Sequence, residues 1–159
     1  MRLAIPPVYP ECGDGGPCLG ADGTVYAIDD VDGLAAFGPD GRARPGWPYE
    51  PAHGFAGHFC TVDAASGTSP VLGPDGRVYA AVVGASDADG EPLTLQIVAL
   101  DPTGRVMPGW PFMLPGTARG EVQLLGVVDG RLYVSLSRCG AAGASTAFLA
   151  LDADGSLSD

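Results

Sequence analysis

Residues 72–79 read Leu-Gly-Pro-Asp-Gly-Arg-Val-Tyr, and this phrase decides the fold. It recurs as Leu-Gly-Ala-Asp-Gly-Thr-Val-Tyr at residues 19–26 and, one residue longer, as Leu-Gly-Val-Val-Asp-Gly-Arg-Leu-Tyr at residues 125–133. Asp-Gly between two apolar runs is a strong hairpin signal, because glycine readily adopts the positive φ that a tight turn needs. The repetition divides the chain into three copies of one unit.

Two further phrases follow the hairpins in a fixed order, the first in all three copies and the second in two of them. Residues 36–42, 99–105 and 150–156 each place Ala and an apolar residue before a Gly-containing turn. The first two copies then close on Pro-Gly-Trp-Pro and an aromatic residue, at residues 45–49 and 108–112. Repeats of this length, without any long apolar stripe of helical period, predict an all-β array of short strands.

We predict four antiparallel strands in each copy, which in the second copy lie at about residues 70–73, 77–84, 93–100 and 105–114. Both faces of the second of these strands are apolar, so we expect it to be covered on both sides. The Pro-Gly-Trp-Pro segment cannot be a central strand, because proline has no N–H to donate. We expect it at the outer edge of the sheet, with its Trp packed between neighbouring units.

The second copy resembles the quinoprotein-like, PQQ-type repeat family of β-propellers. The likeness lies in Asp-Gly-Arg-Val-Tyr at residues 75–79, Ala-Leu-Asp-Pro-Thr-Gly at residues 99–104, and Trp110. The chain departs from the family pattern because the Trp follows at a longer spacing, within Pro-Gly-Trp-Pro. The resemblance implies propeller blades of four antiparallel strands. Such blades occur in non-enzymatic assembly factors and in cofactor-dependent dehydrogenases alike.

We therefore expect a single β-propeller-type domain over residues 1–159 that contains three blades. The third copy lacks a Pro-Gly-Trp-Pro segment of its own, and the N-terminal residues resemble the missing strand. The predicted parts are a closing outer strand at 1–11 that completes the last blade, a first blade at 17–51, a connection at 52–69, a second blade at 70–115 and a third blade at 122–159.

Three blades are fewer than the four to eight of typical propellers, so an apolar inter-blade face is left without a neighbour. We expect self-association into a dimer that completes a six-bladed ring, or association with another protein. A piece of a longer propeller and a compact monomer closed by its own N-terminal strand are the alternatives.

The charge of the chain excludes several classes of partner. Eight basic residues against 19 acidic ones give a net charge of −11, so no basic patch is available to neutralise nucleic-acid phosphates. No apolar run approaches the ~20 residues needed to cross a bilayer, so we expect no membrane insertion. No signal peptide is visible, which leaves a cytoplasmic location and an extracytoplasmic one after removal of a leader both open.

Two groups of side chains are candidate metal ligands. Asp-rich turns, such as the one with Asp87 and Asp89, carry alternating carboxylates as Ca²⁺ sites do, but the complete Asp-x-Asp-x-Asp-Gly series with its closing Glu is absent. We therefore predict no cofactor, with Ca²⁺ at such a turn as the alternative. Imidazole, thiolate and carboxylate groups also cluster in the first connection, at a spacing that matches no zinc motif: His53, His58, Cys60 and Asp63.

The chain has four cysteines, Cys12, Cys18, Cys60 and Cys139. Cys12 and Cys18 are close enough in sequence to bridge a Gly-rich loop, which would leave Cys60 and Cys139 as the second pair. Four cysteines permit three connectivities, and free thiols are equally expected.

No catalytic motif is present, and the repeated aromatic residues are expected first of all to pack between blades. We predict a non-enzymatic module that binds a protein or another macromolecule. One alternative is a small-ligand or carbohydrate-binding propeller with repeated inter-blade pockets, and a second is a fragment of a quinone-cofactor dehydrogenase. The variable connections at 52–69, 84–91 and 138–145 are the expected binding surface. The residues that we single out as candidates for ligand or partner contact are Trp47, Trp110, His53, His58, Asp87 and Asp89.

Overall fold

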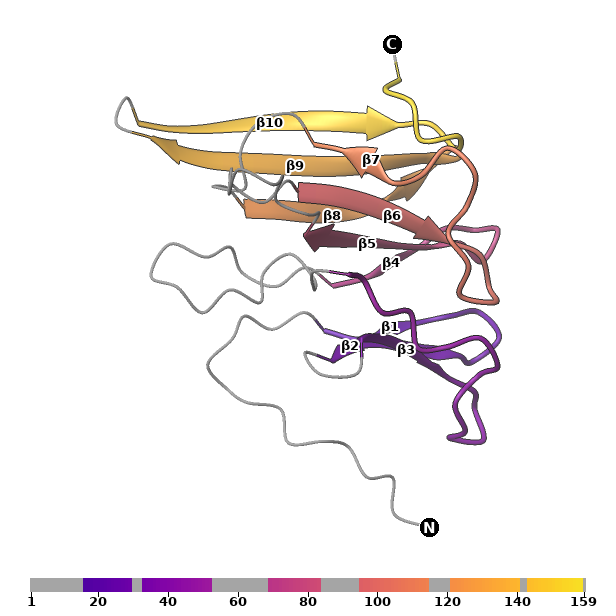
Figure 1. Cartoon of the computed structure of the whole chain (residues 1–159). Coiled ribbons are helices and arrows are strands. Elements are labelled where there is room, and N and C mark those ends of the chain that lie inside the picture. The colour runs from indigo at the N-terminus through magenta and orange to yellow at the C-terminus, as the bar shows by residue number, and fades with distance from the viewer. Residues whose placement is uncertain are drawn as a thin grey trace.

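The chain forms three antiparallel β-sheets that stack one on another (Figure 1). Every regular element in the described part of the chain is a β-strand, which confirms the prediction of an all-β fold. The predicted closing strand at 1–11 and most of the connection at 52–69 lie outside the described residues. The computed structural model describes residues 16–29, 33–52, 69–83, 95–114, 121–140 and 143–158.

In each sheet the strands are hydrogen-bonded in chain order, as in a meander. Apolar and β-branched residues dominate the central strands, such as Val-Tyr-Ala-Ala-Val-Val in the second sheet, and these side chains favour a pleated, covered surface. The strands are β1 (Cys18–Leu19), β2 (Val25–Asp29) and β3 (Gly33–Phe37) in sheet A; β4 (Val71–Leu72), β5 (Val78–Val83), β6 (Leu95–Leu100) and β7 (Phe112–Met113) in sheet B; and β8 (Glu121–Val128), β9 (Arg131–Gly140) and β10 (Gly143–Leu151) in sheet C.

The outer strand of sheet B is shorter than the predicted 105–114. After a single bridge between Val106 and Leu100, the chain turns at Pro108 and Gly109 and pairs with β6 again only at Phe112–Met113. The prolines and the positive φ of Gly109 prevent a continuous ladder. The corresponding outer element of sheet A is a single bridge between Tyr49 and Leu34.

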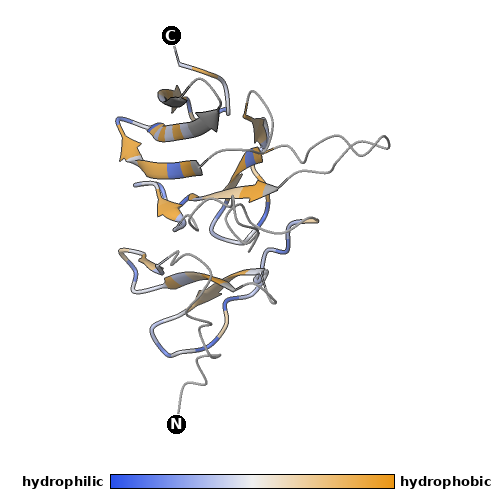
Figure 2. Cartoon of the chain, turned by 90° about the vertical axis from the view of Figure 1, so that its left-hand side faces the viewer, coloured by the Kyte–Doolittle hydropathy of each residue, from blue (hydrophilic) through white to orange (hydrophobic). Residues whose placement is uncertain are grey.

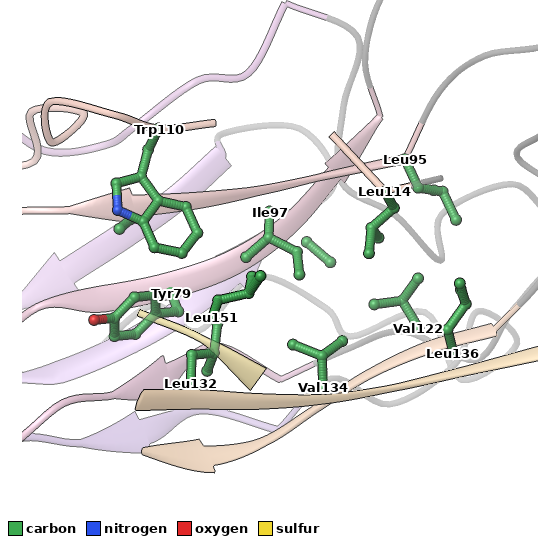
Figure 3. Packing of buried hydrophobic residues seen from close by; sticks show 12 residues of the cluster. Tyr79, Leu95, Ile97, Trp110, Leu114, Val122, Leu132, Val134, Leu136 and Leu151 are labelled. Atoms are coloured by element: carbon green, nitrogen blue, oxygen red, sulfur yellow. The ribbon is translucent and has the colours of Figure 1, made fainter. Parts of the chain in front are cut away.

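Sheet B is buried between the other two sheets, as its two apolar faces predict. Val78, Ala80 and Val82 of β5 pack against sheet A, while the alternate residues Tyr79 and Ala81 pack against sheet C. Figure 3 shows the second of these two cores, with Ile97 and Leu151 between the facing sheets. The alternation of side chains along β5 therefore supplies both hydrophobic cores of the described structure.

The Asp-Gly corners are equivalent in the first two sheets and different in the third. Gly23 and Gly76 adopt φ of 81° and 82° within five-residue loops that join β1 to β2 and β4 to β5. In sheet C the strands continue to a two-residue turn, with φ of 51° at Asp129 and 78° at Gly130, and a bulge at Leu124/Gly126 takes up the extra residue. The three copies of the repeat predict three equivalent Asp-Gly corners, and this prediction is wrong for Asp129.

The turns that carry the repeated Gly residues lie on one side of the stack, on the right in Figure 1. Figure 2 shows hydrophobic residues concentrated on the strands and hydrophilic residues in these turns. The hydrophilic turns of neighbouring sheets therefore lie next to one another on this side of the stack.

Candidate interaction site

One contact joins neighbouring sheets twice and has the same form each time. The Trp110 ring lies edge-to-face against Tyr79 of its own sheet, with ring centroids 5.5 Å apart, and its Nε1 donates a 3.3 Å hydrogen bond to the carbonyl oxygen of Ala153 in sheet C. Trp47 packs against Tyr26 at 5.4 Å and donates to the carbonyl oxygen of Pro102 in sheet B at 3.2 Å. Burial raises the pKa of both tyrosine hydroxyls. Each Trp therefore fixes its own sheet to the turn of the next one.

Glycine permits the backbones to approach closely beside each Trp. Gly109 has a φ of 86°, and a Cβ on it would overlap the carbonyl oxygen of Asp154. Gly155 faces Gly109 from the other side, where a Cβ would meet the Gly109 carbonyl oxygen. Gly46 and Gly104 repeat this relationship between sheets A and B. The repeated Pro-Gly-Trp-Pro and the repeated turn glycine are thus the two halves of one inter-sheet contact.

The acidic residues of the turns are held by hydrogen bonds from their own loops. The carboxylate of Asp154 accepts hydrogen bonds from the hydroxyl of Ser156 at 2.7 Å and from its backbone N–H at 3.0 Å, and both lower the Asp154 pKa. Asp101 is held in the same way by Thr103, and its pKa is lowered as well. These carboxylates therefore cap turns, as Asp commonly does.

The face of each sheet that points toward the next sheet is covered by that sheet in A and B, whereas no further sheet follows sheet C among the described residues. We call this face the leading face. Tyr133 and Phe148 occupy on sheet C the positions that Tyr79 and Ile97 hold on sheet B. Tyr79 is 2% exposed and Ile97 0%, whereas Tyr133 is 39% and Phe148 73% exposed. Tyr133 and Phe148 thus lie exposed at positions whose counterparts in sheet B are buried in an inter-sheet contact. Ser135, which takes the place of Ala81 between them, adds a polar group to this face.

The opposite, trailing face is uncovered on sheet A. Val78 and Leu100 of sheet B are fully buried against sheet A, but their counterparts Val25 and Phe37 have no sheet in front of them among the described residues. Phe37 is exposed and Val25 half-buried. The stack of described sheets therefore has a leading face at one end and a trailing face at the other. At the two interfaces within the chain, a face of one kind packs on a face of the other kind.

The outer edge of β10 is a further open position. Leu34 pairs with Tyr49 in sheet A and Ile97 pairs with Phe112 in sheet B, but the order of sheet C is β10-β9-β8, with no fourth strand beside β10 in the described part of the chain. Phe148 is at the matching position of β10. The outer edge of β10 is bridged by Leu157 at Leu151, but at Phe148 it has no partner strand from those ranges.

Of the residues predicted to contact a ligand, a partner or a metal, only the two tryptophans have described side chains, and both are buried in the inter-sheet contacts. Within the described ranges, no three His, Cys, Asp or Glu side chains come together as a metal site would require, and no helix is long and apolar enough to span a bilayer. The candidates that lie outside the described residues are His53, His58, Cys60, Asp63, Asp87 and Asp89.

Cys18 lies half-buried in β1 and forms no disulfide with another described residue, and burial raises the pKa of its thiol to about 11. Cys12 and Cys60 lie outside the described residues, and Cys139 lies in β9 with its side chain outside them. Both predicted disulfide pairs therefore remain predictions.

Sequence reasoning did not single out Phe148 or Tyr133 as surface residues. The repeats contained the necessary signal, because aligning Ala99-Leu100 with Ala150-Leu151 gives Phe148 the same position in its repeat as the buried Ile97. The sequence matches no protein-family model, and no curated protein matches it significantly. We therefore infer the function from the geometry of the two end faces.

Proposed function

We propose that this chain is a non-enzymatic β-propeller-type module whose function is to assemble with protein, and that its first partner is a second copy of itself. In this proposal each sheet, with its outer segment, is one blade. The leading face of sheet C in one copy stacks on the trailing face of sheet A in the other. Two such contacts close a ring of six blades from two chains.

The observation that carries the proposal is the complementarity of the two end faces. Trailing faces pack on leading faces at both internal interfaces of the chain, A with B and B with C. The remaining leading face exposes Tyr133 and Phe148, and the remaining trailing face exposes Phe37. Stacking a second copy would bury these side chains in the manner already used twice, which is favourable for large apolar groups.

The tryptophans favour this scaffold over a carbohydrate-binding propeller with repeated pockets. The ring of each Trp packs against a Tyr, and its Nε1 already donates to a carbonyl of the next sheet. A sugar ring would need a free aromatic face, and these two are buried. The repeated aromatics therefore support blade packing.

The first experiment measures molar mass by light scattering across a concentration series. We expect a mass twice that of the 16.0 kDa chain. The dimer should become more stable as salt is added, because salt screens the repulsion between two chains that each carry a net charge of −11. A single 16.0 kDa species at every concentration and ionic strength would overturn the proposed self-assembly.

The second experiment tests the head-to-tail arrangement. Phe148→Asp changes the leading face and Phe37→Asp changes the trailing face, so each variant alone should be monomeric. An equimolar mixture should form a dimer, since one leading face and one trailing face remain intact between the two chains. Val106→Asp is the control, because Val106 is similarly exposed but belongs to sheet B, which contributes neither end face. Failure of the mixture to associate would contradict a head-to-tail contact.

A further inference from the structure

We propose that the outer edge of β10, together with the ring of Tyr133, binds an extended peptide segment that carries Trp-Pro followed by an aromatic residue. The site adds a fourth strand to sheet C. It adjoins the surface proposed for stacking and shares Tyr133 with it, and the two uses are compatible because Tyr79 contacts Trp110 and also belongs to the core between sheets B and C.

The occupied form of this site is present twice in the chain. In sheet A, Trp47 lies against Tyr26, and Tyr49 exchanges two backbone hydrogen bonds of 2.9 Å with Leu34. The residue two positions after the Trp thus pairs with the edge of the third strand, while the Trp covers the Tyr of the second strand. One short segment therefore meets both the edge and the ring.

Sheet B repeats the arrangement with a longer pairing. Trp110 lies against Tyr79, Phe112 pairs with Ile97, and the N–H of Leu114 donates to the carbonyl oxygen of Leu95 at 2.9 Å. The two segments share the sequence Pro-Gly-Trp-Pro-aromatic. Their common chemistry defines what the third position would accept.

Sheet C has the same receiving groups, and no such segment lies beside them in the part of the chain that the structure describes. Tyr133 takes the place of Tyr79, and Phe148 takes the place of Ile97 at the edge. The chain after β10 follows the same path as in sheet B, since the N–H of Ser158 donates to Ala150 at 2.9 Å, as Met107 does to Ala99 at 2.8 Å. The two sites therefore match in backbone as far as the structure describes the chain.

Physical reasons favour occupation of this position. An open sheet edge presents unpaired N–H and C=O groups in a row and is a template for an added strand. Tyr133 and Phe148 stay 39% and 73% exposed without a segment over them. A Trp side chain contributes a large buried area and an edge-to-face contact with Tyr. The predicted closing strand at 1–11 contains no Trp, and the two tryptophans of the chain already occupy sheets A and B. A segment that brings a Trp to sheet C would therefore come from outside these 159 residues and would replace the predicted closing strand at this edge.

The test uses a synthetic peptide with the sequence of residues 105–114, Arg-Val-Met-Pro-Gly-Trp-Pro-Phe-Met-Leu, labelled with a fluorophore. Binding to the full chain is followed by fluorescence anisotropy. We expect one peptide per chain, and about tenfold or greater weakening when the peptide Trp is replaced by Ala. The altered peptide leaves the protein untouched, so this comparison does not depend on how a variant folds.

Two measurements on the protein locate the site. Tyr133→Ser should weaken binding about tenfold, whereas Leu125→Ser, at an exposed position on β8 away from the β10 edge, should leave it unchanged. Hydrogen exchange at the Phe148 amide should slow when the peptide is bound. Absence of binding to the full chain would overturn the proposal. Binding that is not weakened by replacing the peptide Trp and does not slow exchange at the Phe148 amide would overturn it as well. Because binding is scored per chain, a monomeric protein that binds the peptide would refute the proposed dimer alone.

Discussion

The indole Nε1 of Trp110 in sheet B donates a hydrogen bond of 3.3 Å to the carbonyl oxygen of Ala153 in sheet C. The same carbonyl oxygen also accepts from Nη1 of Arg77 at 2.9 Å. Trp110 and Ala153 are 43 residues apart in sequence, so this contact joins separate repeats. It gives the stack of sheets a specific register, which hydrophobic burial alone would leave loose.

Replacing Trp110 should therefore separate the two contributions of this side chain. Trp110→Phe keeps an aromatic ring against Tyr79 but removes the hydrogen bond, and we expect it to lower the free energy of unfolding by about 1–2 kcal/mol. Trp110→Ala should lower it by about 3–5 kcal/mol because a large buried ring is lost. Urea denaturation measures both values. An Ala variant as stable as the exposed-site control Val106→Ala would contradict the role assigned to Trp110.

Gly109 and Gly130 form a matched pair that separates backbone strain from steric exclusion. Both have positive φ, 86° and 78°, but a Cβ on Gly109 would overlap the Asp154 carbonyl oxygen, while a Cβ on Gly130 has nothing within 4 Å. Gly130→Ala should lower the free energy of unfolding by about 1–2 kcal/mol, the cost of the left-handed conformation. Gly109→Ala should cost more than about 3 kcal/mol, because the sheets must also move apart. Equal losses in urea denaturation would show that the close approach is unimportant.

Much of this contact was predictable from the repeats. The recurrence of Tyr79, Trp110 and Gly104 with their counterparts in the first copy indicated a hairpin, an edge segment and an inter-unit Trp, and the structure places them so. Two things were not predictable by the same reasoning. Alternation along β5 predicts that both faces are covered but not by which sheet, since the covering residues are far away in sequence.

The conformation of the turn at Asp129 was not predictable from the sequence either, for a local reason. One added residue before Asp-Gly allows either a longer loop or continued pairing, and the pattern of residues is nearly the same in both cases. The structure adopts continued pairing with a bulge at Leu124/Gly126. The pairing of β8 with β9, which runs from Glu121/Ser137 to Val128/Arg131, favours this outcome because each added pair extends an existing ladder.

Acid should destabilise the fold through the turn carboxylates. Hydrogen bonds hold the pKa of Asp22, Asp101 and Asp154 below the ordinary value. A folded-state pKa below the unfolded one gives stability that is present above the unfolded value, about 3.9, and lost as pH falls through the folded value. We expect the urea concentration at the midpoint of unfolding to decrease once the pH is lowered below about 4. Between pH 5 and 7 these carboxylates should leave it constant.

Asp154→Asn tests the contribution of one carboxylate to this acid sensitivity. Asn keeps a side-chain oxygen that can accept from Ser156 but does not titrate, so the variant should lose less stability than the native chain between pH 5 and pH 3. Asp40→Asn is the matched control on an exposed turn. The same acid loss in the Asp154→Asn variant as in the native chain would contradict the assignment.

Cys18 should react slowly with thiol reagents while the protein is folded. Burial raises the pKa of its thiol to about 11, and only the thiolate is nucleophilic, so at pH 8 alkylation should be one to two orders of magnitude slower, roughly, than in urea. Pulse labelling with iodoacetamide and mass spectrometry of the peptides measures this rate, with the urea-unfolded chain as the reference. Labelling of Cys18 at the unfolded rate would show that the thiol is not protected by the stack of sheets A and B.

A disulfide with Cys12 would give a different result, since Cys18 would then stay unlabelled even in urea until a reductant is added. The same experiment therefore decides between a buried thiol and the predicted bridge.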